Sequence, residues 1–200
     1  MINNFIKIFL KILSSLFKNQ EADLLVSPHV NKPKLKVEKN LKTEPGERSL
    51  LFIKGEPNLA TSLITIKVRE LIGDEFGGGI NGWDLNCTEY TLFKLMSLGL
   101  KIEWPVKSGR HGGKWAGIFK NHGRYKVLDY PKINCAMSFT AFMPPYGHVA
   151  FVEEVYKDGS IKISEANWPP PGHPIVGQYN ERILYKKKWE KYGGKFIDFS

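Results

Sequence analysis

Cysteine is scarce in this sequence of 200 residues, which contains only Cys87 and Cys135. Two cysteines are too few for a disulfide framework, and a structural zinc site needs four clustered ligands. Cys135 alternates with apolar neighbours in the strand-like segment NCAMSFTAF, which predicts a buried core residue. A single bridge between the two cysteines is the alternative that this count leaves open.

The sequence also lacks a hydrophobic run long enough to span a bilayer. Its apolar first segment, MINNFIKIFLKILSSLFK at residues 1–18, is interrupted by Lys7 and Lys11 well before the roughly 20 residues that a spanning helix needs. Apolar residues at helical spacing with lysines opposite predict an amphipathic basic helix that targets the protein or associates with a membrane. The alternatives are a helix that docks on a protein surface and a cleaved signal, although no small-residue cleavage site follows the segment.

Signatures of nucleotide binding are missing as well. The glycine-rich segment at residues 73–86 holds a formal G-x-G-x-x-G match, but no predicted strand leads into it and no Gly-Lys-Ser/Thr follows. We therefore expect neither a phosphate-binding loop nor a cofactor. Asp74, Glu75 and Asp84 offer oxygen ligands in the same segment, but they lack EF-hand spacing, so no metal site is predicted.

Positive charge, in contrast, is abundant. The chain holds 29 Lys and Arg against 20 Asp and Glu, a formal net charge of +9, and its one dense basic run is at residues 186–191. Such diffuse basicity is compatible with an anionic bacterial envelope, acidic lipid or nucleic acid, and it does not specify a fold. A hydrophobic content of 42% predicts a globular chain.

The order of predicted elements indicates an α+β domain. Residues 19–56 are charged, contain prolines and have no sustained periodicity, so we predict a linker between the first helix and a domain at 57–200. Helices come first and antiparallel strands afterwards, which is the α+β arrangement. The helices are predicted at 57–72, 86–99 and 109–120, and the strands at 125–130, 133–142, 148–156, 160–167, 181–188 and 195–200.

Four residues of this domain form a candidate catalytic site. Cys87 falls in the first turn of a predicted helix, where free backbone N–H groups and the helix dipole favour a thiolate. His148 follows a Pro-Pro-Tyr-Gly turn at the start of a strand and is the predicted base. The hairpin turn at Asp158-Gly159, which adopts positive φ at little cost, brings Glu165 and Asn167 back beside it. Their spacing of two places both on one strand face.

The segments that carry these residues resemble the CHAP domain, the cysteine- and histidine-dependent amidohydrolase/peptidase module of bacterial and phage peptidoglycan hydrolases. The resemblance covers about residues 75–199 and includes NCTEYTLFKL, GGKWAG, GHVAFVEEV, ISEAN and FIDF. It implies a papain-like fold in which N-terminal helices pack on an antiparallel β-sheet. It also implies that Cys87 is the nucleophile, His148 the general base and acid, Glu165 the orienting carboxylate and Asn167 its polar companion.

The resemblance implies chemistry that requires no metal or cofactor, although some family members carry calcium in the loop before the cysteine. Asn86 stands where the family often has Gln, so we expect different substrate contacts. The oxyanion of the reaction would be met by the backbone N–H of Cys87 and a second donor, for which Asn81 is the candidate.

The resemblance implies a thiol hydrolase that cuts amide bonds in the peptide part of bacterial peptidoglycan, as an endopeptidase or an N-acetylmuramoyl-L-alanine amidase. Peptidoglycan is then the partner, and nucleic acid is not. The place of action is the periplasm or cell wall, reached without a clear cleavable signal. The routes are a phage lysis programme, a secretion apparatus with delivery and immunity partners, or a membrane surface bound by residues 1–18. The alternatives are an amidase for a small amide conjugate and a non-catalytic protein of the wall or membrane.

Overall fold

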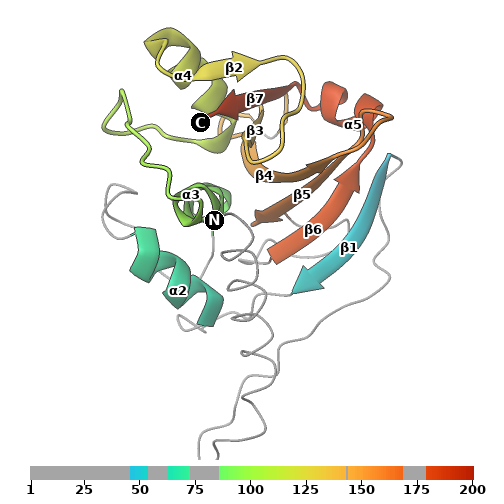
Figure 1. The fold of residues 1–200 in the computed structure, drawn as a ribbon, viewed down its shortest axis with the longest axis horizontal. Coiled ribbons are helices and arrows are strands. Elements are labelled where there is room, and N and C mark those ends of the chain that lie inside the picture. Colours follow the sequence, from blue (N-terminus) through green and yellow to red (C-terminus); the bar gives the residue numbers. More distant parts are fainter. Residues whose placement is uncertain (1–45, 54–62, 73–85, 143, 169–178) are drawn as a thin grey trace, which may run out of the picture. The chain divides into compact units, whose positions relative to one another are not determined.

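The computed structural model describes residues 46–53, 63–72, 86–142, 144–168 and 179–200 (Figure 1). The predictions for the amphipathic helix at 1–18 and for Asp74, Glu75, Asn81 and Asp84 lie outside these residues. Within the described residues, no helix is long and apolar enough to cross a membrane.

Seven strands form one sheet in which every pairing is antiparallel. The order across the sheet is β1-β6-β5-β4-β3-β7-β2, so the strands of the hairpin β4–β5 lie near its middle (Figure 1). The strands are β1 (Glu47–Ile53), β2 (Lys126–Leu128), β3 (Ala136–Phe139), β4 (His148–Val155), β5 (Ile161–Ala166), β6 (Tyr179–Leu184) and β7 (Gly194–Asp198).

The linker predicted at residues 19–56 is wrong at its end, because residues Glu47–Ile53 form the first strand of the sheet. Residues Glu47–Ile53 pair with β6 along its whole length, from Glu47 opposite Leu184 to Ile53 opposite Tyr179. The segment ERSLLFI has no clear alternation of polar and apolar residues, so its sequence did not predict a strand. It forms one at the edge of the sheet because a partner strand about 130 residues later pairs with it. The domain therefore includes residues that precede the predicted boundary at 57.

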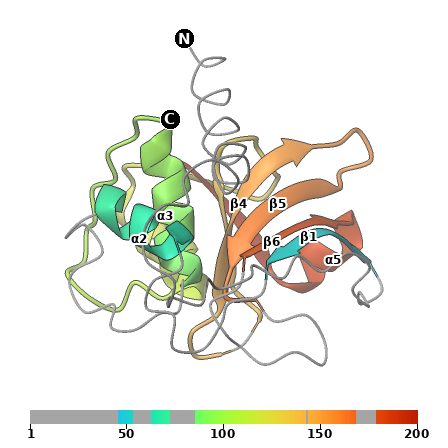
Figure 2. The ribbon, with the colours of Figure 1, turned by 90° about the horizontal axis from the view of Figure 1, so that it is seen from below.

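Helices cover both faces of the sheet. Figure 2 shows α2 and α3 on one side of the strands and α5 on the other. The prediction of an α+β domain with helices packed on an antiparallel sheet is confirmed. The helical elements are α2 (Leu63–Ile72), α3 (Cys87–Ser97), the 3₁₀ turn η2 (Gly112–Lys114), α4 (Trp115–His122) and α5 (Lys186–Lys191).

The strand predicted at 181–188 is wrong in its second half, because α5 begins at Lys186. The strand ends at Leu184, and the carbonyl of Tyr185 accepts the N–H groups of Lys188 and Trp189 to open a helical turn. Trp189 is buried, and its indole N–H donates to the carbonyl of Gly159 at 2.9 Å. Burial of this aromatic ring favours a turn over a continued strand in a segment that is otherwise basic.

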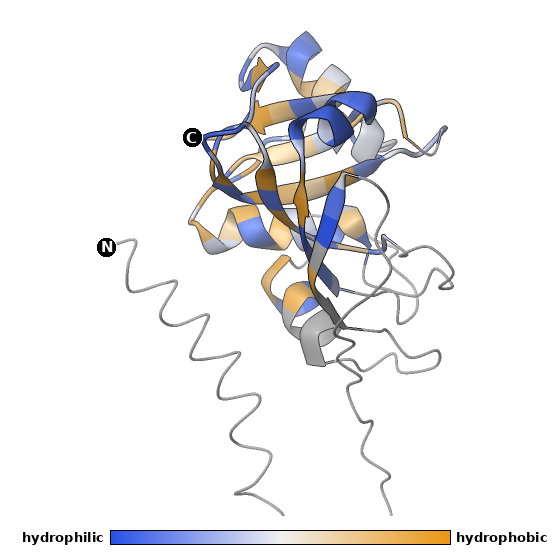
Figure 3. Cartoon of the chain, turned by 90° about the vertical axis from the view of Figure 1, so that its right-hand side faces the viewer, coloured by the Kyte–Doolittle hydropathy of each residue, from blue (hydrophilic) through white to orange (hydrophobic). Residues whose placement is uncertain are grey.

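Each face of the sheet has its own hydrophobic core, and Figure 3 shows hydrophobic stretches along strands of the sheet. The first core lies under α3 and α4 and includes Tyr90, Leu95, Trp115, Phe119, Val149 and Phe151. The second core includes Cys135, Met137, Phe139, Ala150, Ile163, Trp168, Trp189 and Phe196. Cys135 is fully buried with a free thiol, as predicted, and Cys87 is also free, so the alternative of a bridge between them is wrong.

The hairpin β4–β5 has a turn and a register different from those expected of a tight Asp-Gly turn. Of the two turn residues Asp158 and Gly159, only Gly159 has positive φ (79°). The loop closes through hydrogen bonds from Gly159 N–H to Tyr156 O and from Tyr156 N–H to Ser160 O. Further along, Val152 lies opposite Ile163 but Glu154 opposite Lys162, so β4 contains a β-bulge. The turn and the bulge together set which residues of β5 face which residues of β4.

Three glycines allow the 3₁₀ turn η2 to lie directly on the start of β4. A Cβ on Gly112 would lie 2.7 Å from the backbone carbon of His148, and a Cβ on Gly113 would lie 2.7 Å from the Cα of Gly147. The Gly113 N–H donates to the carbonyl of Tyr146 at 3.0 Å. Gly147 also has a φ of 63°, which side chains disfavour. The backbone before His148 is therefore fixed by a contact that only glycine permits.

We predict that Gly147→Ala destabilises the fold by about 2 to 5 kcal/mol. This range adds about 1 to 2 kcal/mol for a left-handed alanine to about 1 to 3 kcal/mol for overpacking. Gly99→Ala is the matched control, because Gly99 has a φ of 80° and nothing within 4 Å of its added Cβ. Urea unfolding of both variants measures the difference, and equal losses would contradict a close contact between η2 and the turn before β4.

Candidate active site

Cys87 is the first residue of α3, as predicted, and the start of this helix is held by buried polar groups. Asn86 is the N-cap residue, and its backbone N–H donates to the carboxylate of Glu89 at 2.9 Å. The other oxygen of Glu89, a fully buried side chain, pairs with Nε of Arg69 on α2 at 2.8 Å. The ion pair fixes α2 against the first turn of α3, and the half-buried Cys87 thiol is thereby held at a defined helix terminus.

His148 opens β4 and is buried, with 3% of its side chain exposed. The imidazole contacts Phe139 and Trp168 edge-on, with ring centroids 5.0 and 4.7 Å apart. Both aromatic residues belong to the second core, so packing restricts the rotation of the ring.

Glu165 of β5 orients the imidazole through a direct hydrogen bond. Its Oε2 lies 2.8 Å from Nε2 of His148, and the carboxylate is fully buried. Because Nε2 is engaged by this carboxylate, Nδ1 is the nitrogen left for the Cys87 thiol, which lies close enough to raise the pKa of the imidazole. The structure therefore brings three of the four predicted residues together in the order Cys87, His148, Glu165.

The charges of this cluster stabilise one another. Burial of His148 opposes its charged form, but the negative charges and hydrogen bonds of Cys87 and Glu165 outweigh burial and raise its pKa from 6.5 to about 9. Burial likewise opposes the charged form of Glu165, but the Arg182 guanidinium and the hydrogen bond from His148 hold its pKa below the usual value. The arrangement favours a protonated imidazole beside an ionised carboxylate.

Asn167 does not take the place that its spacing predicted. The strand β5 ends at Ala166, and Asn167 has a φ of 59°, so the alternation of the strand does not extend to it. In the described part of the chain its Oδ1 is buried and accepts no hydrogen bond. The prediction that Asn167 shares the strand face of Glu165 is therefore wrong, because the backbone turns out of the extended conformation there.

The residues that surround Glu165 instead come from β6. Arg182 Nε lies 2.6 Å from Oε1 of Glu165 and its Nη2 lies 3.2 Å from Oε2, while Asn180 Nδ2 approaches Oε1 at 3.5 Å. Asn180 also donates to the carbonyl of Trp168 at 2.7 Å. Sequence reasoning missed both residues. The available signal was the spacing of Asn180, Arg182 and Leu184, which places a charged residue on the buried face of a strand, where it needs a partner of opposite charge.

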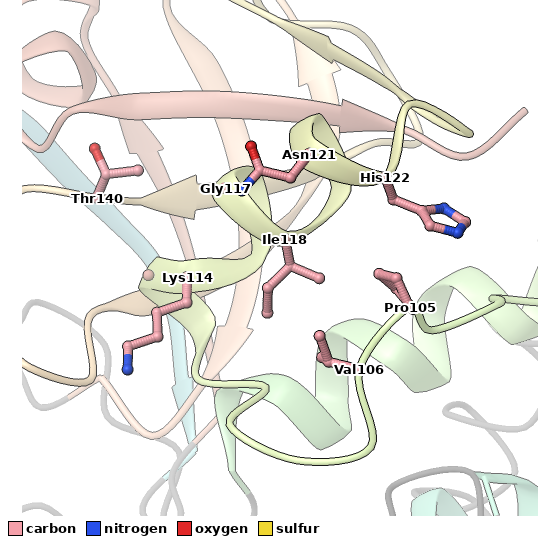
Figure 4. Close-up of a pocket in the computed structure, with 9 residues that line it drawn as sticks. Pro105, Val106, Lys114, Gly117, Ile118, Asn121, His122 and Thr140 are labelled. Carbon is pink, nitrogen blue, oxygen red and sulfur yellow. The ribbon is translucent and has the colours of Figure 1, made fainter.

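A pocket of about 580 Å³ lies beside this cluster, and none of the four predicted residues lines it. Ile118 and His122 of α4 and Pro105 and Val106 of the preceding loop border it (Figure 4). Its connection to the site is Gly113, which lines the pocket and contacts the residue before His148. Among the described residues, no three His, Cys, Asp or Glu side chains gather to hold a metal ion.

Three relatives and a solved structure resemble this chain in part. A probable autolysin of Staphylococcus aureus is 39% identical over 94 residues, which are 47% of this chain and 31% of the relative. An N-acetylmuramoyl-L-alanine amidase domain-containing protein of the same organism is 35% identical over 85 residues, 40% of this chain and 13% of the relative. A secreted 45 kDa protein of Lactococcus lactis is 32% identical over 102 residues, 48% of this chain and 20% of the relative.

The crystal structure of an N-acetylmuramoyl-L-alanine amidase from Staphylococcus aureus aligns with 57% of this chain and 30% of its own, with a TM-score of 0.47 and 28% identity. The chain thus spans about a third or less of the length of these relatives. The family model of the CHAP domain matches residues 76–167, a range that contains Cys87, His148 and Glu165. Residues 76–167 are therefore similar to the CHAP domain family.

Proposed function

We propose that the protein is a cysteine hydrolase that cuts amide bonds in the peptide part of bacterial peptidoglycan. The observation that carries the proposal is the buried imidazole of His148, which hydrogen-bonds to Glu165 and whose pKa is raised by the neighbouring Cys87 thiol. A structural histidine does not need a thiol at a helix start and an ionised carboxylate at once.

In this mechanism the Cys87 thiolate attacks the carbonyl carbon of the amide. The carbonyl π electrons move to oxygen, and the resulting oxyanion meets the backbone N–H groups at the start of α3. The imidazolium of His148 then donates its proton to the amide nitrogen and the C–N bond breaks. The amine leaves, and the acyl group stays bound to the sulfur of Cys87 as a thioester.

Hydrolysis of the acyl group reverses the role of His148. The neutral imidazole takes a proton from water, whose oxygen attacks the thioester, and the thiolate leaves as the carboxylic acid product forms. Glu165 stays ionised throughout, because Arg182 holds its pKa down, and it keeps the ring oriented in both steps. The predicted role of Asn167 as a polar companion of Glu165 stays a prediction, and the scheme does not depend on it.

The substrate class rests on the family and its named relatives. A CHAP domain match, a probable autolysin and an amidase domain-containing protein all support a polymer of the bacterial cell wall as substrate. The net charge of +9 favours adsorption to an anionic envelope. The names of secreted relatives support action outside the cytoplasm, at the cell wall.

For residues 1–18 we propose association with a membrane surface. The segment pairs an apolar helical face with lysines opposite, the pattern of a helix that lies in the interface of an anionic bilayer.

Replacement of the nucleophile tests the reaction. We predict that Cys87→Ala abolishes the release of soluble fragments from purified peptidoglycan, because no other described thiol lies beside His148. Cys135→Ala is the control, since that thiol is buried in the second core and should leave the activity within about twofold of wild type. Mass spectrometry of the fragments identifies the amide that is cut. Equal product from wild type and Cys87→Ala would rule out the cysteine mechanism.

The pH dependence tests the role of Glu165. The raised pKa of His148 keeps the imidazolium present up to about pH 9, so kcat/KM of the wild type should fall as the pH rises through that value. Glu165→Gln removes a negative charge that raises this pKa, so the alkaline fall should move to lower pH. Glu154→Gln, an exposed site on the same hairpin, is the control and should keep the wild-type profile. An unshifted profile in Glu165→Gln would show that the carboxylate does not act on His148.

Truncation tests the amphipathic segment. We predict that removal of residues 1–20 leaves hydrolysis of soluble peptidoglycan fragments unchanged, because Cys87, His148 and Glu165 all come from the domain that follows. The same truncation should reduce sedimentation with vesicles that contain phosphatidylglycerol, since it removes both the apolar face and its lysines. Full-length and truncated protein that sediment equally would contradict the membrane proposal.

A further inference from the structure

Behind Glu165, a second ion pair continues the line of buried charges. Nη1 of Arg182 contacts Oε2 of Glu47, the first residue of β1, at 2.5 Å. Oε1 of Glu47 accepts a hydrogen bond from the hydroxyl of Tyr192 and lies 3.4 Å from Nζ of Lys188. The side chains of Glu47, Arg182 and Lys188 are only 6%, 5% and 7% exposed.

The geometry of Arg182 matches the needs of Glu165. Nη2 donates a hydrogen bond to Oε2 of Glu165 and Nη1 contacts Glu47, while Nε lies 2.6 Å from Oε1 as an ion-pair contact without a hydrogen bond. Contacts to both oxygens restrict the plane of the carboxylate as well as its distance. Since Oε2 of Glu165 also bonds to Nε2 of His148, the plane of the carboxylate decides where the imidazole is held.

Trp168 supplies a second contact along the same line. The guanidinium of Arg182 lies over its ring at 4.1 Å, and the imidazole of His148 contacts the same ring with centroids 4.7 Å apart. Movement of Arg182 would therefore displace both the carboxylate and the aromatic ring that hold His148.

We propose that Arg182 and Glu47 are positioning residues for the catalytic imidazole, and that the edge strand β1 is part of the catalytic unit because it supplies Glu47. This proposal rests on the proposed function, and it extends the site to two residues outside the family match at 76–167. The charged and titratable groups that face His148, directly or through this line, are Cys87, Glu165, Arg182, Glu47, Lys188 and Tyr192.

The test compares two substitutions that each remove one negative charge from the sheet. Glu47→Gln leaves the positive charge of Arg182 less balanced, which disfavours the imidazolium of His148. We expect the alkaline fall of the reaction to move down by about one pH unit. Glu181→Gln is the matched control, because Glu181 precedes Arg182 on β6, faces the other way, and pairs with Lys162.

The rate at which iodoacetamide alkylates Cys87 as a function of pH is the first readout, and kcat/KM on peptidoglycan is the second. Alkylation requires no substrate, so it decides the positioning proposal separately, while the peptidoglycan assay alone decides the proposed function. A shift in both profiles for Glu47→Gln, absent from Glu181→Gln, supports the proposal. Identical profiles for the two variants, or a loss of thermal stability in Glu47→Gln with a wild-type profile, would overturn it.

A second variant keeps the test decisive if Glu47→Gln does not fold. Arg182→Lys retains the positive charge but cannot contact both oxygens of Glu165 and Glu47 at once. We expect kcat to fall by about 10- to 100-fold with KM changed less, because the substitution displaces the imidazole of His148 but does not remove its positive charge. Wild-type kcat in a folded Arg182→Lys protein would contradict a positioning role.

Discussion

Glu165 carries a full negative charge in a place that water does not reach, and the surrounding structure is arranged to balance that charge. An isolated carboxylate in such a site costs several kcal/mol, so it persists only with close partners of opposite charge and complete hydrogen bonding. The partners come from two other strands, and a third strand balances the charge of one partner. His148 opens β4, Arg182 lies on β6, and Glu47 on β1 balances the charge that Arg182 adds. The central strands of the sheet are thus linked through charged side chains as well as through their backbones.

The two catalytic residues of the proposed couple, Cys87 and His148, pack against different hydrophobic cores on opposite faces of the sheet. Cys87 packs against the core under α3, whereas His148 contacts Phe139 and Trp168 of the other core. The nucleophile and the base therefore reach each other at the start of β4, where η2 and the glycine contact before His148 hold the backbone. Arg69 and Glu89 fix the helix on one side, and Arg182 fixes the carboxylate on the other. Cys87 and His148 are thus each held in place by a separate ion pair.

Sequence reasoning found the parts of the site that depend on local structure. Asn86 is a favourable N-cap, so it marks the start of α3 and the place of Cys87. His148 and Glu165 were found because both belong to one hairpin. Residues that depend on distant pairing were missed, since nothing near Glu47 indicates that it pairs with a strand some 130 residues later. Asn167 was misplaced because strand alternation was extended past a residue with positive φ.

The β-bulge in β4 has a consequence for comparing such sites by sequence. His148 and Glu165 are 17 residues apart, and they face the same side only because β4 has one more residue than β5 between Val152 and the turn. A hairpin with one residue fewer in β4 and a regular ladder would present the same pair in the same way. Two homologous enzymes can therefore differ by one in the interval between base and carboxylate without any change in chemistry. An alignment that forces equal intervals would shift one strand and assign the carboxylate to a neighbour whose side chain points to the opposite face.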